Sequence, residues 1–208
     1  MNFMQLRERQ SKFPVTVKTG EGVVELIWNK IEYADGYRVF ASPVGKNHFV
    51  GVINVKGTTA VMKKRANGVP MQYKVKAFRI ADGPDNFFGE SEIVIACPLE
   101  TPRRLTAIVG SDGICTLSWR YNSQCDGFKI YADSNESGKY SFVCYSGKNS
   151  CRLDSFTKSG KVSFVVRSFI MTGHMEKLGV SSAPAEAVLP KSKGTKAVQF
   201  DHSMIRKT

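Results

Sequence analysis

A single offset relates widely separated parts of this sequence. It is 91 residues for three pairs of motifs: a tryptophan (Trp28 and Trp119), an Asp-Gly-aromatic tripeptide (35–37 and 126–128) and a run of alternating character (73–78 and 164–169). Because one spacing holds across separate elements, the chain is a tandem repeat. Each copy is long enough to form a domain with its own core.

Apolar residues occupy every second position along the main runs of each copy. Val24, Leu26 and Trp28 show this spacing in the first copy, and Tyr73 and Val75 show it again. A period of two predicts half-buried strands. Turn-forming residues at 34–36, 43–45, 67–68 and 82–84 separate the runs at intervals too short for helices. The sequence therefore predicts an all-β fold of the sandwich type.

Taken together, these motifs resemble fibronectin type III domains, twice over. The resemblance is carried by the tryptophan that ends the second strand, the aromatic-x-aliphatic third strand (37–39 and 128–130), the sixth strand (73–78 and 164–169), the closing serines (Ser91 and Ser182) and the terminal prolines (Pro98 and Pro190). It implies two consecutive fibronectin type III-like seven-stranded β-sandwiches, at residues 14–98 and 99–190. Short non-globular arms at 1–13 and 191–208 flank them.

The net charge of +12 is spread unevenly, since the two arms hold half of the excess. Short basic extensions on near-neutral domains favour contact with an acidic surface, whether a neighbouring subunit, nucleic acid or an anionic glycan. A merely solubilising tail is the alternative. The arm residues predicted to make such contacts are Phe3, Leu6, Arg7, Arg9, Lys191, Lys193, Lys196, Phe200, Arg206 and Lys207.

Two further features indicate the cellular compartment of the protein. No apolar run reaches the roughly 18 residues of a membrane span, and residues 1–9 lack the apolar core of a signal peptide. We therefore expect no membrane insertion and synthesis in the cytoplasm. The five cysteines are odd in number and show no C-x-x-C spacing, which favours a reducing compartment. Pairing of Cys144 with Cys151 across a hairpin is the alternative.

The sequence offers no catalytic constellation. The three histidines, His48, His174 and His202, fall in a predicted hairpin, a loop and the tail, without the nucleophile and base that covalent catalysis requires. Ser-Gly-Lys occurs three times but lacks the upstream glycine of a phosphate-binding loop. We expect a protein that is not an enzyme and that needs no cofactor or metal ion.

Two predicted loops and one predicted face are candidates for partner binding. The segment 81–90 should place Phe87 and Phe88 at an exposed tip, where they meet a partner or the seam between domains. The equivalent segment 170–179 centres on Met175, with simple loop packing as the alternative.

On the outer face of the sheet that holds the third and sixth strands, Arg38, Lys74 and Lys76 should point the same way and form a small basic patch. A solvated polar face is the alternative explanation.

Three functions are compatible with these features. The resemblance favours a non-enzymatic structural or interaction subunit of a large, oligomeric assembly, foremost a bacteriophage virion protein of the tail, baseplate or capsid decoration. Its partners would be other protein subunits, with the virion as its location. A carbohydrate-binding or adhesive module at the cell surface or outside the cell is the first alternative. Nucleic-acid binding through the basic arms is the second.

Overall fold

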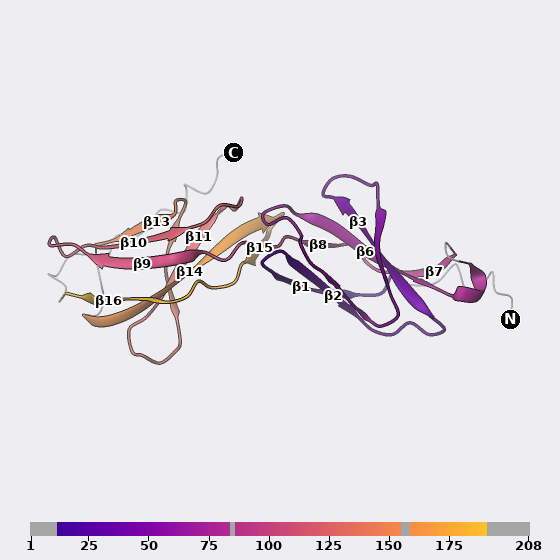
Figure 1. Cartoon of the computed structure of the whole chain (residues 1–208), viewed down its shortest axis with the longest axis horizontal. Helices are drawn as coiled ribbons and strands as arrows, with labels where there is room; N and C mark the ends of the chain where they lie inside the picture. Colours follow the sequence, from indigo (N-terminus) through magenta and orange to yellow (C-terminus); the bar gives the residue numbers. More distant parts are fainter. Residues whose placement is uncertain (1–11, 84–85, 155–158, 191–208) are drawn as a thin grey trace. The chain divides into compact units, whose positions relative to one another are not determined.

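The computed structural model describes residues 12–83, 86–154 and 159–190. Strands dominate this part of the chain, and they pair within each copy of the repeat (Figure 1). No helix in these three ranges is long and apolar enough to cross a membrane. The predicted arms lie outside the described residues, apart from Lys12 and Phe13.

The first sandwich consists of a three-stranded sheet, in the order β1-β2-β5, and a larger sheet in the order β4-β3-β6-β7, where β8 also pairs with β6. All these strand pairs are antiparallel. Its elements are β1 (Val15–Gly20), β2 (Val23–Trp28), β3 (Gly36–Pro43), β4 (Val50–Val55), β5 (Thr59–Met62), β6 (Met71–Phe78), the 3₁₀ turn η1 (Ile80–Asp82), β7 (Phe87–Glu90) and β8 (Val94–Ala96).

The second sandwich repeats this plan, with sheets in the orders β13-β10-β9 and β12-β11-β14-β15, where β16 also pairs with β14. Its strands are β9 (Arg103–Val109), β10 (Cys115–Arg120), β11 (Gly127–Asp133), β12 (Ser141–Ser146), β13 (Ser150–Leu153), β14 (Gly160–Thr172), β15 (Met175–Leu178) and β16 (Ala185–Leu189). The predicted all-β fold of two fibronectin type III-like sandwiches is confirmed. In each copy the predicted seventh strand is interrupted, so it forms two short strands.

The core of the first sandwich follows from the alternation in the sequence. Side chains of successive strand residues point to opposite faces, and Val24, Leu26 and Trp28 on β2 are buried while their neighbours are partly exposed. Trp28 packs edge-on against Tyr37 of β3, with ring centroids 5.2 Å apart. Trp119 and Phe128 repeat this contact in the second sandwich at 5.1 Å.

The Asp-Gly motif has a structural role in both copies. The Asp35 carboxylate accepts a hydrogen bond from the backbone N–H of Ile80, at 2.9 Å. The Asp126 carboxylate accepts the equivalent bond from Met171, at 2.6 Å. Each aspartate therefore ties the start of the third strand to the chain just beyond the sixth-strand motif, in the turn η1 in the first copy and within β14 in the second, which explains why this motif recurs at the repeat offset.

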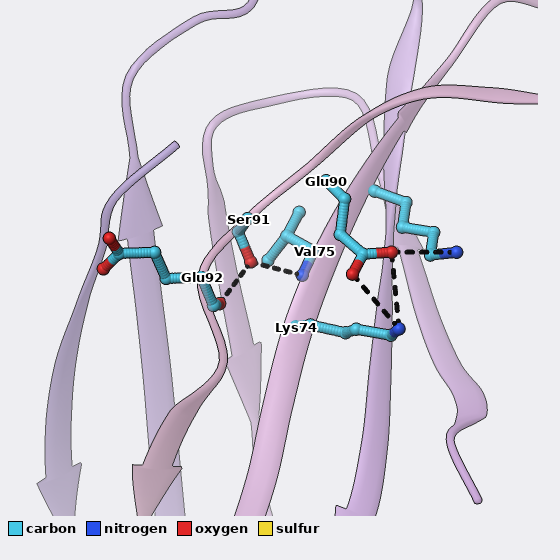
Figure 2. A network of polar contacts seen from close by, with 6 residues as sticks. Lys74, Val75, Glu90, Ser91 and Glu92 are labelled. Atoms are coloured by element: carbon cyan, nitrogen blue, oxygen red, sulfur yellow. Dashed lines mark hydrogen bonds and ion pairs between the residues drawn. The ribbon is translucent and has the colours of Figure 1, made fainter. Parts of the chain in front are cut away.

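A buried serine marks the interruption of the last strand. Ser91 is fully buried between β7 and β8, and its Oγ accepts a hydrogen bond from Val75 N–H at 2.9 Å and donates one to Glu92 O at 2.7 Å (Figure 2). In the second sandwich the Ser182 Oγ accepts the equivalent bond from Val166 N–H at 3.0 Å. Where the last strand is interrupted, the serine hydroxyl thus replaces a backbone carbonyl as the acceptor for an N–H of the neighbouring strand.

Two expectations about loops are wrong. Phe87 and Phe88 do not sit at a loop tip, because they begin strand β7, which pairs with β6. The segment around Met175 is a tight hairpin: β14 continues to Thr172, pairs with β15 and leaves only Gly173 and His174 to turn. Phe13, at the predicted end of the amino-terminal arm, already forms a parallel bridge with Ser91.

Candidate interaction face

The outer face of the larger sheet in the first sandwich gathers cations and aromatic rings. We call it the cation–aromatic face, and it comprises Arg38, Phe40, Phe49, Lys74, Lys76, Phe87 and Glu90. Because Tyr37 and Val39 are buried, alternation turns Arg38 and Phe40 outward. The register then sets Arg38 opposite Lys76 and Phe40 opposite Lys74 on β6. Arg38, Lys74 and Lys76 therefore share one face, as the period of the strands predicts.

Each cation of this face lies against an aromatic ring. The Arg38 guanidinium is 5.4 Å from the centre of the Phe87 ring. The Lys76 ammonium is 5.6 Å from the ring centres of both Phe40 and Phe87. The Phe40 and Phe87 rings meet edge-on with centroids 5.5 Å apart. Such contacts attract a cation to the electron-rich ring face and restrict the motion of its side chain.

The third cation is covered more deeply. The Lys74 ammonium lies 4.6 Å from the centre of the Phe49 ring, and only 17% of its side chain is exposed. This is low for a lysine, whose ammonium group is normally well hydrated. Its position is thus fixed by the ring on one side and by a carboxylate on the other.

That carboxylate belongs to Glu90, which pairs with both lysines; Figure 2 shows its contact with Lys74. Its oxygens are 3.3 Å from the Lys74 ammonium and 3.0 Å from the Lys76 ammonium. Partial burial opposes ionisation of Glu90, but the hydrogen bonds and charges of Lys76 and Lys74 outweigh it and lower its pKa. The face therefore already holds one carboxylate, which Lys74 and Lys76 share, while Arg38 lies against Phe87 and donates a hydrogen bond to Asn54.

This arrangement suits charge recognition. It holds positive groups at fixed positions for a carboxylate, phosphate or sulfate of a partner. It is unsuited to stacking of a base or a sugar ring, because the cations of the same chain occupy the faces of Phe40, Phe49 and Phe87.

The corresponding face of the second sandwich is more apolar. Lys129 stands at the repeat position of Arg38, and its ammonium is 5.8 Å from the Phe142 ring centre and 5.1 Å from that of Tyr145. Phe142 and Tyr145 belong to the edge strand β12 and are 48% and 37% exposed. Val165 replaces Lys74 at the repeat position and is buried. The two copies thus present different surfaces on the same sheet.

The remaining candidates are dispersed. Phe88 packs against the core of the first sandwich and lies under Arg79, whereas Met175 is 60% exposed at the start of β15. The predicted arm residues all lie outside the described part of the chain: Phe3, Leu6, Arg7, Arg9, Lys191, Lys193, Lys196, Phe200, Arg206 and Lys207. Their contacts stay a prediction.

No catalytic or metal site emerges in the described ranges. His48 and His174 are both exposed, and no group of three His, Cys, Asp or Glu side chains is placed to hold a metal ion among the described residues. The absence of enzymatic activity stays a prediction.

Sequence reasoning missed Phe40, Phe49 and Glu90. Phe40 had a usable signal, because it is in phase with Arg38 and out of phase with the buried Tyr37 and Val39. Phe49 and Glu90 had none, since their places on this face depend on how strands far apart in the sequence lie together.

No protein-family profile matches the chain, and no curated protein sequence matches it. Among solved structures it is similar to the FN1–FN3 domains of chicken CNTN1, with 18% identity and a TM-score of 0.40 over 86% of this chain and 67% of that one. It is also similar to a segment of two fibronectin type III domains from chicken tenascin, with 16% identity and a TM-score of 0.47 over 85% of this chain and 97% of that one. The strand order within each copy makes this chain a tandem of two fibronectin type III-like sandwiches.

Proposed function

We propose that this protein is a non-enzymatic interaction subunit that docks an acidic surface of a partner protein on the cation–aromatic face. The observation that carries the proposal is the set of three cations held against aromatic rings, two of which, Lys74 and Lys76, also pair with the Glu90 carboxylate. Among the residues that define this face, three carry a positive charge and one carries a negative charge.

The geometry favours binding because the cations are ordered before a partner arrives. A flexible lysine or arginine loses side-chain entropy on binding, which weakens an interface by roughly 0.5–1.5 kcal/mol per side chain. Here Phe40, Phe49 and Phe87 already restrict the cations. These cations therefore lose less side-chain entropy when a partner carboxylate binds.

A protein partner is favoured over a single-stranded nucleic acid, which binds largely by stacking its bases on open aromatic faces, because here the chain's own cations lie on those faces. An anionic glycan would bind through its charged groups, and the test below separates it from a protein partner. The basic arms offer nucleic acid a separate route, which would depend strongly on salt.

The wider assembly that we propose is a bacteriophage virion, in which the basic arms anchor the subunit to its neighbours. Tandem sandwiches with basic extensions at both ends support this role. It is tested by mass spectrometry of purified phage particles that encode the chain: a copy number typical of a structural subunit supports the role, and absence from the particles contradicts it.

The anchoring role of the arms has its own test. Light scattering compares the full-length protein with a chain trimmed to residues 12–190, which keeps Phe13 because it pairs with Ser91. We expect a multimer that dissociates on trimming. An unchanged monomer whose arms are cleaved rapidly by protease contradicts the proposal.

Binding by the face is tested with three polyanions: a polyglutamate peptide, heparin and single-stranded DNA. The double variant Arg38→Gln and Lys76→Gln removes two positive charges from the face. Lys18→Gln with Lys63→Gln is the matched control, because it removes the same charge from exposed positions on or next to the smaller sheet.

We expect the face variant to bind polyglutamate about tenfold more weakly or worse, since charge-assisted hydrogen bonds contribute roughly 1.5–3 kcal/mol each. The control should change binding by about twofold or less, because screened surface charges act weakly. Equal losses in the two variants would show that only net charge matters. Binding to heparin or DNA alone would favour the alternatives.

A further inference from the structure

Two cysteines of the second sandwich are in contact. The Sγ atoms of Cys144 and Cys151 are 3.3 Å apart. Cys144 lies on β12 and Cys151 on β13, and these strands belong to different sheets. The pair therefore does not lie across a hairpin, which was the alternative considered from the sequence, but spans the two sheets of the sandwich.

The repeat shows that this contact occupies a position defined by the fold. At the offset of 91 residues, Cys144 corresponds to Ile53 and Cys151 to Ala60. Ile53 packs against the core of the first sandwich, and Ala60 is fully buried within it. An aliphatic pair suffices in the first copy, whereas the second copy has a thiol at both positions.

The two thiols differ in accessibility and in acidity. Cys144 is buried, and Cys151 is partly exposed. The hydrogen bond between them raises the pKa of Cys144 and lowers that of Cys151, and burial of Cys144 raises its pKa further. Burial raises the pKa of the other three thiols, Cys97, Cys115 and Cys125. Cys151 is thus the thiol best suited to begin an exchange reaction.

We propose that Cys144 and Cys151 form a disulfide that joins the two sheets of the second sandwich when the protein meets a small-molecule disulfide such as oxidised glutathione. The proposal is independent of the proposed function, since it involves neither the cation–aromatic face nor the arms.

The reaction proceeds by two thiol–disulfide exchanges. The Cys151 thiolate attacks one sulfur of the small disulfide, whose S–S bond breaks, and one small thiolate leaves. The Cys144 thiol then loses its proton to water and attacks the Cys151 sulfur, which releases the second small thiolate. Two protein thiols are oxidised, and one small disulfide is reduced to two thiols.

The cross-link would act on an exposed edge. Strand β12 is at the end of its sheet, and it carries Phe142 and Val143, both at least 40% exposed. An apolar edge strand can pair with another chain unless it is held or covered. Attaching β12 to β13 would keep this edge in the sandwich after the protein leaves a reducing compartment.

The test treats the full-length reduced protein with oxidised glutathione, alkylates the remaining thiols in denaturant and maps the peptides by mass spectrometry. We expect Cys144 and Cys151 to lose alkylation together and to appear in one cross-linked species of monomeric size. Cys97, Cys115 and Cys125 should stay alkylated. A stable glutathione adduct on Cys151, a disulfide-linked dimer or full alkylation of all five cysteines would overturn the proposal.

The matched variant is Cys144→Ile with Cys151→Ala, which gives the second copy the pair found in the first. It should fold, and its three thiols should react identically with and without glutathione. Oxidation should raise the thermal midpoint of the wild-type protein and leave that of this variant unchanged. Equal shifts in both proteins would mean that the stabilisation does not come from this cross-link.

Discussion

Replacing either closing serine by alanine should destabilise the sandwich to which it belongs. The Ser91 hydroxyl accepts the backbone N–H of Val75, and both residues are fully buried. In Ser91→Ala that N–H has no acceptor and is not accessible to water. Ser182→Ala has the same effect on the N–H of Val166.

The magnitude follows from the group that is left unpaired. An unsatisfied buried donor costs about 1–3 kcal/mol. The O–H of the serine disappears with the side chain, so the only donor left unpaired by the substitution is the Val75 N–H. The backbone bond from Ser91 N–H to Val75 O, at 2.8 Å, remains and limits the loss. We therefore expect a decrease of about 2 kcal/mol in the free energy of unfolding for each variant.

Urea unfolding followed by tryptophan fluorescence measures this decrease, because Trp28 and Trp119 provide one reporter in each sandwich. Ser141→Ala is the control, since this serine is exposed on β12. The control should change the free energy by about 0.5 kcal/mol or less. If Ser91→Ala proves as mild as the control, the serine hydroxyl is not a necessary acceptor for the Val75 N–H.

Three further predictions concern the faces and the thiol pair. The pKa of Glu90 lies below its ordinary value of 4.5. Its ion pairs therefore stabilise the fold above that pH, and this stabilisation is lost as the pH falls through the folded pKa. The thermal midpoint of the wild-type protein should drop towards that of Glu90→Gln as the pH is lowered below about 4.5. Phe87→Ala should cost about 2 kcal/mol in urea unfolding, because a partly buried ring is removed, and it should weaken polyglutamate binding by freeing Arg38. Oxidation of Cys144 and Cys151 closes a loop of eight residues and should raise the free energy of unfolding by about 2.5 kcal/mol. Urea unfolding measures this as a higher midpoint, and an unchanged midpoint would contradict the expected effect of the closed loop on the unfolded chain.

Much of the scaffold could be predicted from the sequence. Alternation identified the buried faces of the strands, and the repeat offset showed that the pattern occurs twice. The same offset reappears in hydrogen bonds, since Asp35 and Asp126 each accept the backbone N–H of the residue 45 positions further along the chain. These features depend on local patterns, which is why they could be read before the structure was known.

The segment 81–90 was misjudged for a physical reason. Gly83 and Pro84 indicate a turn, and this turn was extended to include the two phenylalanines that follow. In the structure Phe87 is opposite Phe78 of β6 and packs against Phe40 of β3. Register between strands is set by pairing and hairpin geometry, so a short strand beside a turn cannot be distinguished from a loop by its own sequence.

The two copies differ where the fold leaves them free to differ. Buried tryptophans, turn aspartates and closing serines recur because each satisfies the same backbone or core requirement in both sandwiches. The outer face has no such requirement, and there Lys74 and Glu90 correspond to Val165 and Ser181. The lysine–carboxylate cluster is therefore not a consequence of the fold. It is a feature of the first sandwich alone, and this favours recognition of a partner over maintenance of the sheet as the reason for its presence.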